Sequence, residues 1–325
     1  MVSNAVLEKQ PKLSAAPRAL LEKPPQILRA QTSAQIQSSI VAIKAQGTRP
    51  PLYFVHGVGG GMFWGYANLA RHLSPDQPVY GFKPRGLDGA GQTIEEMAAH
   101  YVADLRAFQP HGPYLLGGFC FGGSVAYEMA RQLAAAGEAP ALLVLLNSAS
   151  PNTDYEKIRF CCSPRWLAKF FCNAAYWLAR FVKHWRPSER REFISWKLRV
   201  CRHKLKALLR LSAAQMAQLD VDELVDLAKY SDEERRVWET HVRALLCYKP
   251  KPYPGHVTLF RMRGHPLFCS FDPLYGWGAL AQRGVTVKIV PGQHSSMLEE
   301  SHVQILAEEL ECCLADARTK GASRS

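Results

Sequence analysis

The sequence predicts an α/β fold, in which a mostly parallel β-sheet is covered by helices on both faces. Short apolar runs typical of buried strands alternate with segments whose apolar residues recur at helical spacing. This alternation stops for about a hundred residues, roughly 152–250, and then resumes for two more strands. A mainly helical segment inserted before the last two strands predicts a lid on the α/β core.

The predicted elements follow one another along the chain from Pro51. Strands are expected at Leu52–Val55, Val79–Phe82, Tyr114–Leu116, Leu142–Leu146, Val257–Met262 and Val285–Val290. Helices are expected at about Met62–Leu73, Ile94–Phe108, Gly122–Ala136 and Val303–Ala315. The first strand and helix are joined by the glycine-rich turn His56–Gly61, a conformation that glycine adopts most easily.

One domain, residues 39–315, is expected between two flexible ends. Residues 1–38 contain scattered Pro, Gln, Ala and Ser without apolar periodicity, which is typical of a flexible leader. Residues 316–325 are expected to form a flexible tail.

The composition excludes several classes of protein. With 47% hydrophobic and 21% charged residues, the chain is neither disordered nor a coiled coil. Nine cysteines without a signal peptide indicate a reducing, cytoplasmic location, and none lies at zinc-ligand spacing, so no metal is expected. No apolar run approaches the roughly 18 to 20 residues that a membrane span needs.

The net charge of +12 is concentrated in one stretch of the chain. Residues 157–210 hold 15 basic and 2 acidic residues, a charge of +13, and the rest of the chain sums to −1. The excess is therefore a property of the predicted lid, and it indicates a negatively charged partner. Nucleic acid is not expected, because no nucleic-acid-binding motif accompanies the charge.

A strand-to-helix turn carries the candidate nucleophile, Cys120. The sequence Gly118-Phe119-Cys120-Phe121-Gly122-Gly123 is the G-x-S-x-G nucleophile elbow with Cys in place of Ser. Small neighbours allow a strained turn that projects the nucleophile, and the N-terminus of the next helix favours a thiolate. A buried structural cysteine is the alternative, but the strand before the turn and the helix after it favour catalysis.

His294 is the candidate general base, because it follows the last predicted strand and precedes the last helix. The order nucleophile, orienting residue, histidine is that of α/β-hydrolases. The other ten histidines have simpler interpretations. His56 is expected to be structural in the glycine turn, and His241 lies in a helical stretch.

Four groups of residues together resemble the type I thioesterase family, the α/β-hydrolase thioesterases that end nonribosomal peptide and polyketide assembly lines. They are Pro51–Gly61, Gly118–Gly123, Asn147–Pro151, and Tyr253-Pro254-Gly255 through Gly276-Trp277 to Gly292-Gln293-His294. The resemblance covers about residues 39–315 and implies the α/β-hydrolase fold. It also implies an acyl-enzyme intermediate and a substrate held as a thioester on the phosphopantetheine of an acyl or peptidyl carrier protein, with no further cofactor.

The chain departs from this family at two positions, Cys120 and Asn147, where the family usually has Ser and Asp. Together they recreate the Cys-His-Asn arrangement of papain-like proteases. A thiol is acidic enough to form a thiolate beside imidazolium, so a neutral amide that orients the ring suffices. Asp272, after strand Val257–Met262, is the alternative third member, although a turn residue before Pro273 would also explain it.

The expected oxyanion hole consists of two backbone N–H groups, those of Val58 in the glycine turn and Phe121 after the nucleophile. An acyl group on Cys120 would itself be a thioester and would stay activated toward amines. We therefore expect release by aminolysis or ring closure onto an amine or alcohol acceptor, with water as a competitor. A cysteine hydrolase of lipid esters at a membrane and a catalytically weak adaptor that binds a carrier protein remain alternatives.

Three interpretations of the basic, tryptophan-rich lid remain open. It could be a solvated helix pair that covers the site, a docking surface for an acidic carrier protein, or a peripheral attachment to anionic lipid. The lid residues expected to face a carrier or lipid are Arg165, Trp166, Lys169, Arg180, Lys183 and Trp185.

Overall fold

The computed structural model describes residues 38–84, 93–153, 155, 163–184, 232–265, 269–292, 294 and 296–322. Contacts divide the chain into two units, Met1–Ser39 and Ile40–Ser325. All the helices and strands described below belong to the second unit.

Seven strands form one sheet in the order β1-β3-β2-β4-β5-β6-β7. The strands are β1 (Ile40–Lys44), β2 (Leu52–Val55), β3 (Val79–Phe82), β4 (Leu115–Phe119), β5 (Leu142–Leu146), β6 (Val257–Met262) and β7 (Val285–Val290). Only β1 is antiparallel to its neighbour, and the other pairs are parallel. The carboxyl ends of β2 to β7 therefore lie along one edge of the sheet.

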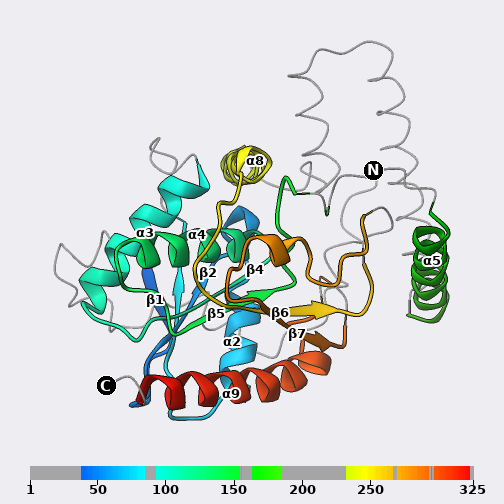
Figure 1. The fold of residues 1–325 in the computed structure, drawn as a ribbon. Helices are drawn as coiled ribbons and strands as arrows, with labels where there is room; N and C mark the ends of the chain where they lie inside the picture. Colours follow the sequence, from blue (N-terminus) through cyan, green and yellow to red (C-terminus); the bar gives the residue numbers. More distant parts are fainter. Residues whose placement is uncertain are drawn as a thin grey trace, which may run out of the picture. The chain divides into compact units, whose positions relative to one another are not determined.

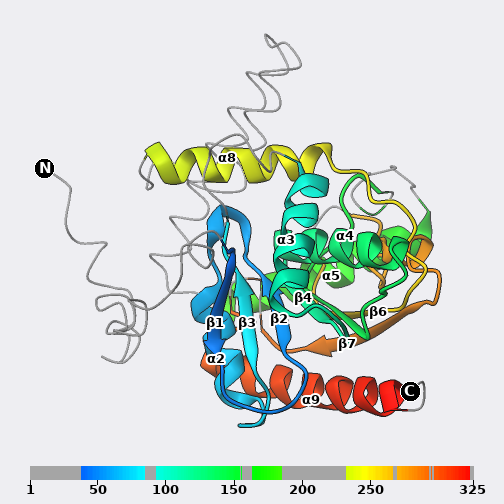
Figure 2. The same cartoon turned by 90° about the vertical axis from the view of Figure 1, so that its left-hand side faces the viewer.

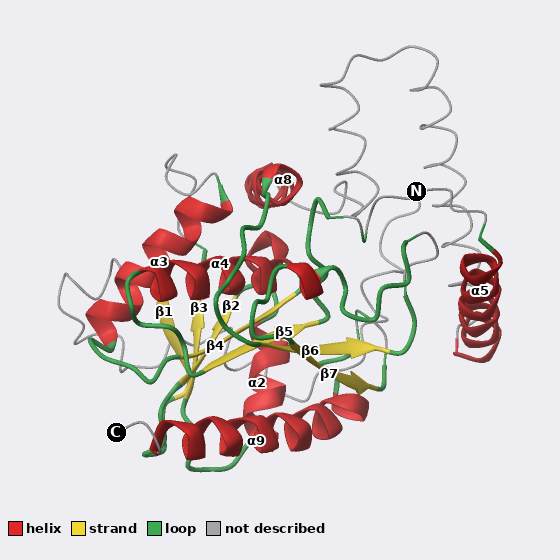
Figure 3. Cartoon of the chain, viewed as in Figure 1, coloured by secondary structure: helices red, strands yellow, loops and turns green. Residues whose placement is uncertain are grey.

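Helices cover both faces of the sheet (Figures 1 and 3). The helices α3 (Ile94–Phe108) and α4 (Phe121–Ala135) pack on one face, and α2 (Phe63–His72) and α9 (Glu300–Ala322) pack on the other. Alternate residues of β2 supply the two cores, because Tyr53 faces α3 and α4 while Phe54 faces α2 and α9. Burial on both faces explains the continuous apolar runs of these strands.

The structure confirms the predicted α/β fold and the insertion before the last two strands. Two helices of the insertion are described, α5 (Pro164–His184) and α8 (Asp232–Cys247), and both lie in the chain between β5 and β6. The views in Figures 1 and 2 show α8 apart from α9, over the side of the sheet where α3 begins.

The structure differs from the expected elements at both ends of the domain. Strand β1 was not predicted, since its run Ile40–Lys44 is only partly buried and shows no clear alternation. Residues 316–322, predicted to be part of a flexible tail, belong to α9. The apolar stripe of α9 continues through Leu314 and the buried Ala317, so the helix keeps its packing surface beyond residue 315.

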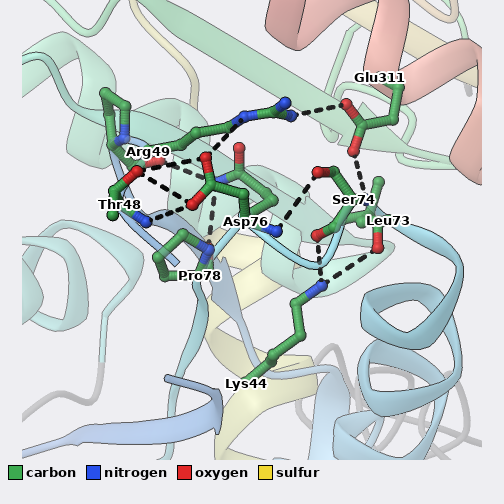
Figure 4. Close-up of polar contacts among 10 residues, drawn as sticks. Lys44, Thr48, Arg49, Leu73, Ser74, Asp76, Pro78 and Glu311 are labelled. Atoms are coloured by element: carbon green, nitrogen blue, oxygen red, sulfur yellow. Dashed lines mark hydrogen bonds and ion pairs between the residues drawn. The ribbon is translucent and has the colours of Figure 1, made fainter. Parts of the chain in front are cut away.

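A polar cluster ties the edge of the sheet to α2 and α9 (Figure 4). The ammonium group of Lys44 donates to the carbonyl oxygens of Ala70, Leu73 and Ser74 at 2.7, 3.2 and 2.8 Å. A carboxylate oxygen of Glu311 accepts the Ser74 N–H at 2.7 Å. The cation thus satisfies carbonyl groups at the C-terminus of α2, where the helix dipole favours positive charge.

We expect Lys44→Met to lower the free energy of unfolding by about 1 to 2 kcal/mol, because the substitution keeps most of the aliphatic chain but leaves these carbonyl groups without a charged donor. The urea midpoint measures the change. Lys288→Met is the control, since its ion pair with Glu309 is half-exposed and should contribute less than about 1 kcal/mol. Equal losses in the two variants would contradict this assignment.

Candidate functional site

The candidate site lies where the order of the strands reverses. Strand β2 pairs with β3 on one side and with β4 on the other. Successive connections leave in opposite directions from this point, so the loops after β2 and β4 diverge and leave room at the sheet edge. The first loop holds Val58, and the second is the turn at Cys120.

Cys120 has the strained backbone expected of a nucleophile elbow. Its φ of 52° and ψ of −115° are unfavourable for a residue with a side chain, and it lies directly before α4. A Cβ at Gly118 would lie 2.1 Å from the Gly122 carbonyl oxygen, and one at Gly122 would lie 2.5 Å from the carbonyl oxygens of Val55 and His56. Only glycine fits at both positions, which explains the spacing of the motif.

Cys120 and His294 form a hydrogen-bonded pair. Burial opposes ionisation of the thiol, but the neighbouring His294 ring and the Phe121 N–H lower the pKa of Cys120 below its ordinary value. Desolvation likewise opposes the charge on His294, but interaction with Cys120 raises the pKa of the imidazole. Both shifts favour the thiolate and imidazolium forms. The Cys120 side chain is partly buried, and that of His294 reaches solvent.

Asn147 contacts the other side of the His294 ring. It follows β5 with a φ of 45°, in the left-handed region that Asn tolerates better than most residues. Its N–H donates to the Phe260 carbonyl oxygen at 2.6 Å, and its side-chain amide lies 2.5 Å from Nδ1 of His294. Within the described part of the chain, the buried Oδ1 of Asn147 has no hydrogen-bond partner.

Asp272, the alternative third member, is engaged elsewhere. Its two carboxylate oxygens accept the N–H groups of Leu274 and Gly276 at 3.0 and 2.9 Å. The Trp277 indole, just beyond this turn, donates to the Ser148 carbonyl oxygen at 2.8 Å. Asp272 therefore shapes a turn that braces the chain after Asn147, which is the role expected of a turn residue before proline.

The two predicted oxyanion donors lie on either side of the strand reversal. The Phe121 N–H reaches the Cys120 sulfur and is one cause of its lowered pKa. Val58 begins a short 3-10 helix, Val58–Gly60, in a loop closed by a 2.9 Å hydrogen bond from Gly57 N–H to the Gly61 carbonyl oxygen. The loop is compact, because Gly59 and Gly60 have φ angles of 71° and 81°.

The structure also brings two further histidines to this loop. His56 is fully buried, with its ring nitrogens 2.7 Å from the Gly57 carbonyl oxygen and 2.8 Å from the Tyr101 hydroxyl. His241 of α8 accepts the Gly59 N–H through Nδ1 at 3.1 Å. The sequence indicates a structural His56 but gives no sign of the role of His241, since helical spacing does not reveal where a lid helix packs.

Some of the predicted lid residues are described. Arg165 and Lys169 of α5 are exposed, and the Trp166 indole donates to the Cys269 carbonyl oxygen at 3.1 Å. Trp185 and the side chains of Arg180 and Lys183 lie outside the described residues. Neither α5 nor any other helix in the described ranges is both long and apolar enough to cross a bilayer.

Comparison with known proteins relates the chain to thioesterase domains. Residues 50–159 match the family model of the Thioesterase domain. Malpibaldin synthetase of Mortierella alpina is 46% identical over 116 residues, which are 35% of this chain and 2% of that protein. A dimodular nonribosomal peptide synthase of Bacillus subtilis is 40% identical over 116 residues, which are 35% of this chain and 5% of that protein. The chain thus corresponds to a small part of these relatives.

Solved structures extend the likeness to most of the chain. The NocB thioesterase domain, in covalent complex with a fluorophosphonate nocardicin G analog, is 25% identical with a TM-score of 0.55, and the match covers 85% of this chain and 99% of that one. A four-domain nonribosomal peptide synthetase bound to AMP and glycine is 26% identical with a TM-score of 0.56, covering 84% of this chain and 20% of that one. These matches support the resemblance to type I thioesterases, and the chain has the α/β-hydrolase fold of thioesterase domains.

Proposed function

We propose that the protein is a thioesterase that releases or transfers an acyl group from the phosphopantetheine arm of a carrier protein, through an acyl intermediate on Cys120. The observation that carries the proposal is the row Cys120, His294, Asn147 at the carboxyl edge of the sheet, beside two candidate oxyanion donors. The carrier protein as partner is supported by the similarity to a dimodular nonribosomal peptide synthase and to a four-domain nonribosomal peptide synthetase.

The first half-reaction moves the acyl group to the enzyme. The Cys120 thiolate attacks the thioester carbonyl carbon, and the N–H groups of Val58 and Phe121 stabilise the oxyanion that forms. When the intermediate collapses, the bond to the pantetheine sulfur breaks and His294 gives its proton to that sulfur. The products are a free pantetheine thiol, neutral His294 and an acyl thioester on Cys120.

The second half-reaction passes the acyl group to an acceptor. Neutral His294 removes a proton from the attacking amine, alcohol or water as the new bond to the carbonyl carbon forms. The Cys120 thiolate leaves, and the ion pair is restored. Because a thioester is more reactive toward amines than an oxoester, we infer aminolysis or ring closure as the favoured outcome, with hydrolysis in competition.

Asn147 is assigned to orient His294. The imidazolium has hydrogen on both nitrogens, so the group facing Nδ1 must accept a hydrogen bond. A half-turn of the Asn147 amide exchanges its nitrogen and oxygen positions and presents Oδ1 to that hydrogen. Oδ1, which has no hydrogen-bond partner in its buried position, would thereby gain the imidazolium N–H as a donor, while the amide nitrogen would take the position that Oδ1 leaves.

Alkylation by iodoacetamide tests the ion pair without involving an acyl group. Because the pKa of Cys120 is lowered, we expect its alkylation to persist below the ordinary thiol pKa of about 8.5. In His294→Ala, burial acts on the thiol without the imidazole, so the inflection should move to higher pH. Peptide mass spectrometry measures the rate at Cys120, with the exposed Cys172 as the internal reference. An unchanged inflection would refute the pair.

Substitution of Asn147 and Asp272 distinguishes their roles. We expect Asn147→Ala to lower kcat/KM roughly 10- to 100-fold, less than the roughly 10⁴-fold loss when the Asp of a serine triad becomes Asn, since a thiolate needs less support from its base. Asp272→Ala should lower the thermal midpoint and leave the rate per folded molecule nearly unchanged, because that carboxylate binds backbone N–H groups. The reverse pattern would make Asp272 the orienting residue.

Acyl trapping tests the function itself. With an acyl-pantetheine thioester, intact mass spectrometry should show one acyl group on the wild-type protein, and a panel of primary amines should yield amides in excess of free acid. Cys120→Ala should lose both the adduct and turnover, while the control Cys247→Ala, at an exposed thiol, should keep them. Full turnover by Cys120→Ala would exclude the nucleophile, and free acid as the sole product would exclude aminolysis.

A further inference from the structure

Helix α8 of the lid rests directly on the glycine loop after β2. A Cβ placed on Gly59 would lie 2.3 Å from the Trp238 indole nitrogen, so helix and loop are in close contact. Val242 is buried against Val58 and Trp238. His241 is only 5% exposed and accepts the Gly59 N–H at 3.1 Å. Neighbouring residues of α8 thus hold both the candidate oxyanion donor Val58 and the residue that follows it.

The hydrogen bond requires a neutral His241. A ring nitrogen accepts the Gly59 N–H only when it carries no hydrogen, so Nδ1 is bare and the hydrogen lies on Nε2. Burial, and then the neighbouring His56, lower the pKa of His241 to about 3. Burial likewise lowers the pKa of His56 to about 4, although the Gly57 carbonyl oxygen partly opposes that change. Both rings are therefore neutral near pH 7.

The same ring also contacts the side chain of Phe121, the residue that supplies the second candidate donor. His241 stacks on the Phe121 ring with centroids 4.8 Å apart and planes 15° from parallel, and it stacks on His56 at 5.0 Å. His56 is itself fixed by the Gly57 carbonyl oxygen and the Tyr101 hydroxyl. One lid side chain thus touches both loops that supply the candidate oxyanion donors, on either side of the strand reversal.

We propose that His241 is a positioning residue for the oxyanion hole. Its acceptor nitrogen holds the N–H of the Val58–Gly59 peptide group and so restrains the backbone of Val58, while its ring packs on the Phe121 ring. Seating of α8 and alignment of the two donors are therefore one event, and a site with the lid displaced would keep its nucleophile but stabilise the oxyanion poorly. This inference rests on the proposed thioesterase function for its catalytic consequence, but the contact itself does not.

Two variants distinguish the hydrogen bond that His241 accepts from the stacking of its ring. His241→Phe keeps a flat aromatic ring for stacking on Phe121 and removes the acceptor. His241→Asn loses the ring but places Oδ1 near the position of Nδ1, where it accepts the Gly59 N–H. His256→Phe is the matched control, because it makes the same exchange at an exposed histidine near the start of β6, hydrogen-bonded to Thr286.

Two reactions of Cys120 are compared in each variant. Acylation by an acyl-pantetheine thioester passes through an oxyanion, whereas alkylation by iodoacetamide does not. We expect His241→Phe to slow acylation about 10- to 100-fold, below the roughly 10²- to 10³-fold loss of a whole donor, and to leave alkylation unchanged. His241→Asn should recover most of the acylation rate. Parallel loss of both reactions, or acylation unchanged in His241→Phe, would overturn the proposal.

A readout independent of catalysis separates this inference from the proposed function. In protein labelled with ¹⁵N-glycine, the Gly59 amide should exchange with solvent faster in His241→Phe than in the wild type, and His241→Asn should restore its protection. Thermal midpoints confirm that each variant is folded. If wild-type Cys120 accepts no acyl group, the proposed function fails while the exchange result still decides the contact. Unchanged Gly59 exchange in folded His241→Phe overturns the inference even if acylation occurs.

Discussion

The backbone at Cys120 is the constraint on which the site depends. A positive φ at a residue with a side chain is unfavourable and persists only where the surroundings enforce it. Here β4 is paired on both sides, the Cys120 N–H donates to the Leu146 carbonyl oxygen at 2.9 Å, and glycines bring α4 against the end of β2. The central strands of the sheet, which are thoroughly buried, thus hold Cys120 in its unfavourable backbone conformation.

The strained turn does not decide which chemistry the site performs, because Ser and Cys both fit it. The chemistry depends instead on how the nucleophile is matched to its base and to the residue that orients the base. A hydroxyl needs a base supported by a carboxylate, whereas the thiol of Cys120 shares its proton with His294 and needs only an oriented ring. In the proposed mechanism Asn147 meets this need and, unlike a carboxylate, adds no negative charge beside a thiolate. Cys120 and Asn147, which stand where type I thioesterases usually have Ser and Asp, are therefore chemically compatible with each other, and each would be harder to explain alone.

The sequence predicts what local patterns determine. The buried parallel strands and the elbow follow from apolar runs and glycine spacing, and the structure contains them, although β4 spans Leu115–Phe119 where the prediction ended the strand at Leu116. Strand β1 could not be predicted, because an edge strand with partly buried residues shows no clear alternation of apolar and polar residues. The role of His241 could not be predicted for another reason. Its contact with Gly59 joins residues 182 positions apart, and no local pattern encodes the packing of an inserted helix. The three candidate catalytic residues, Cys120, Asn147 and His294, could be predicted because each follows a strand of the same sheet.

Three histidines near the candidate nucleophile differ in charge because their surroundings differ. The pKa of His294 is raised, since the thiol beside it outweighs the loss of solvation. The pKa values of His56 and His241 are lowered to about 4 and about 3, chiefly by burial. The positive charge is thus favoured on the ring that donates a proton in the proposed mechanism, while the rings that contact the glycine loop stay neutral. Neutrality of His241 matters in turn, because a protonated ring would lose its acceptor for Gly59 and would put a buried cation between α8 and the loop.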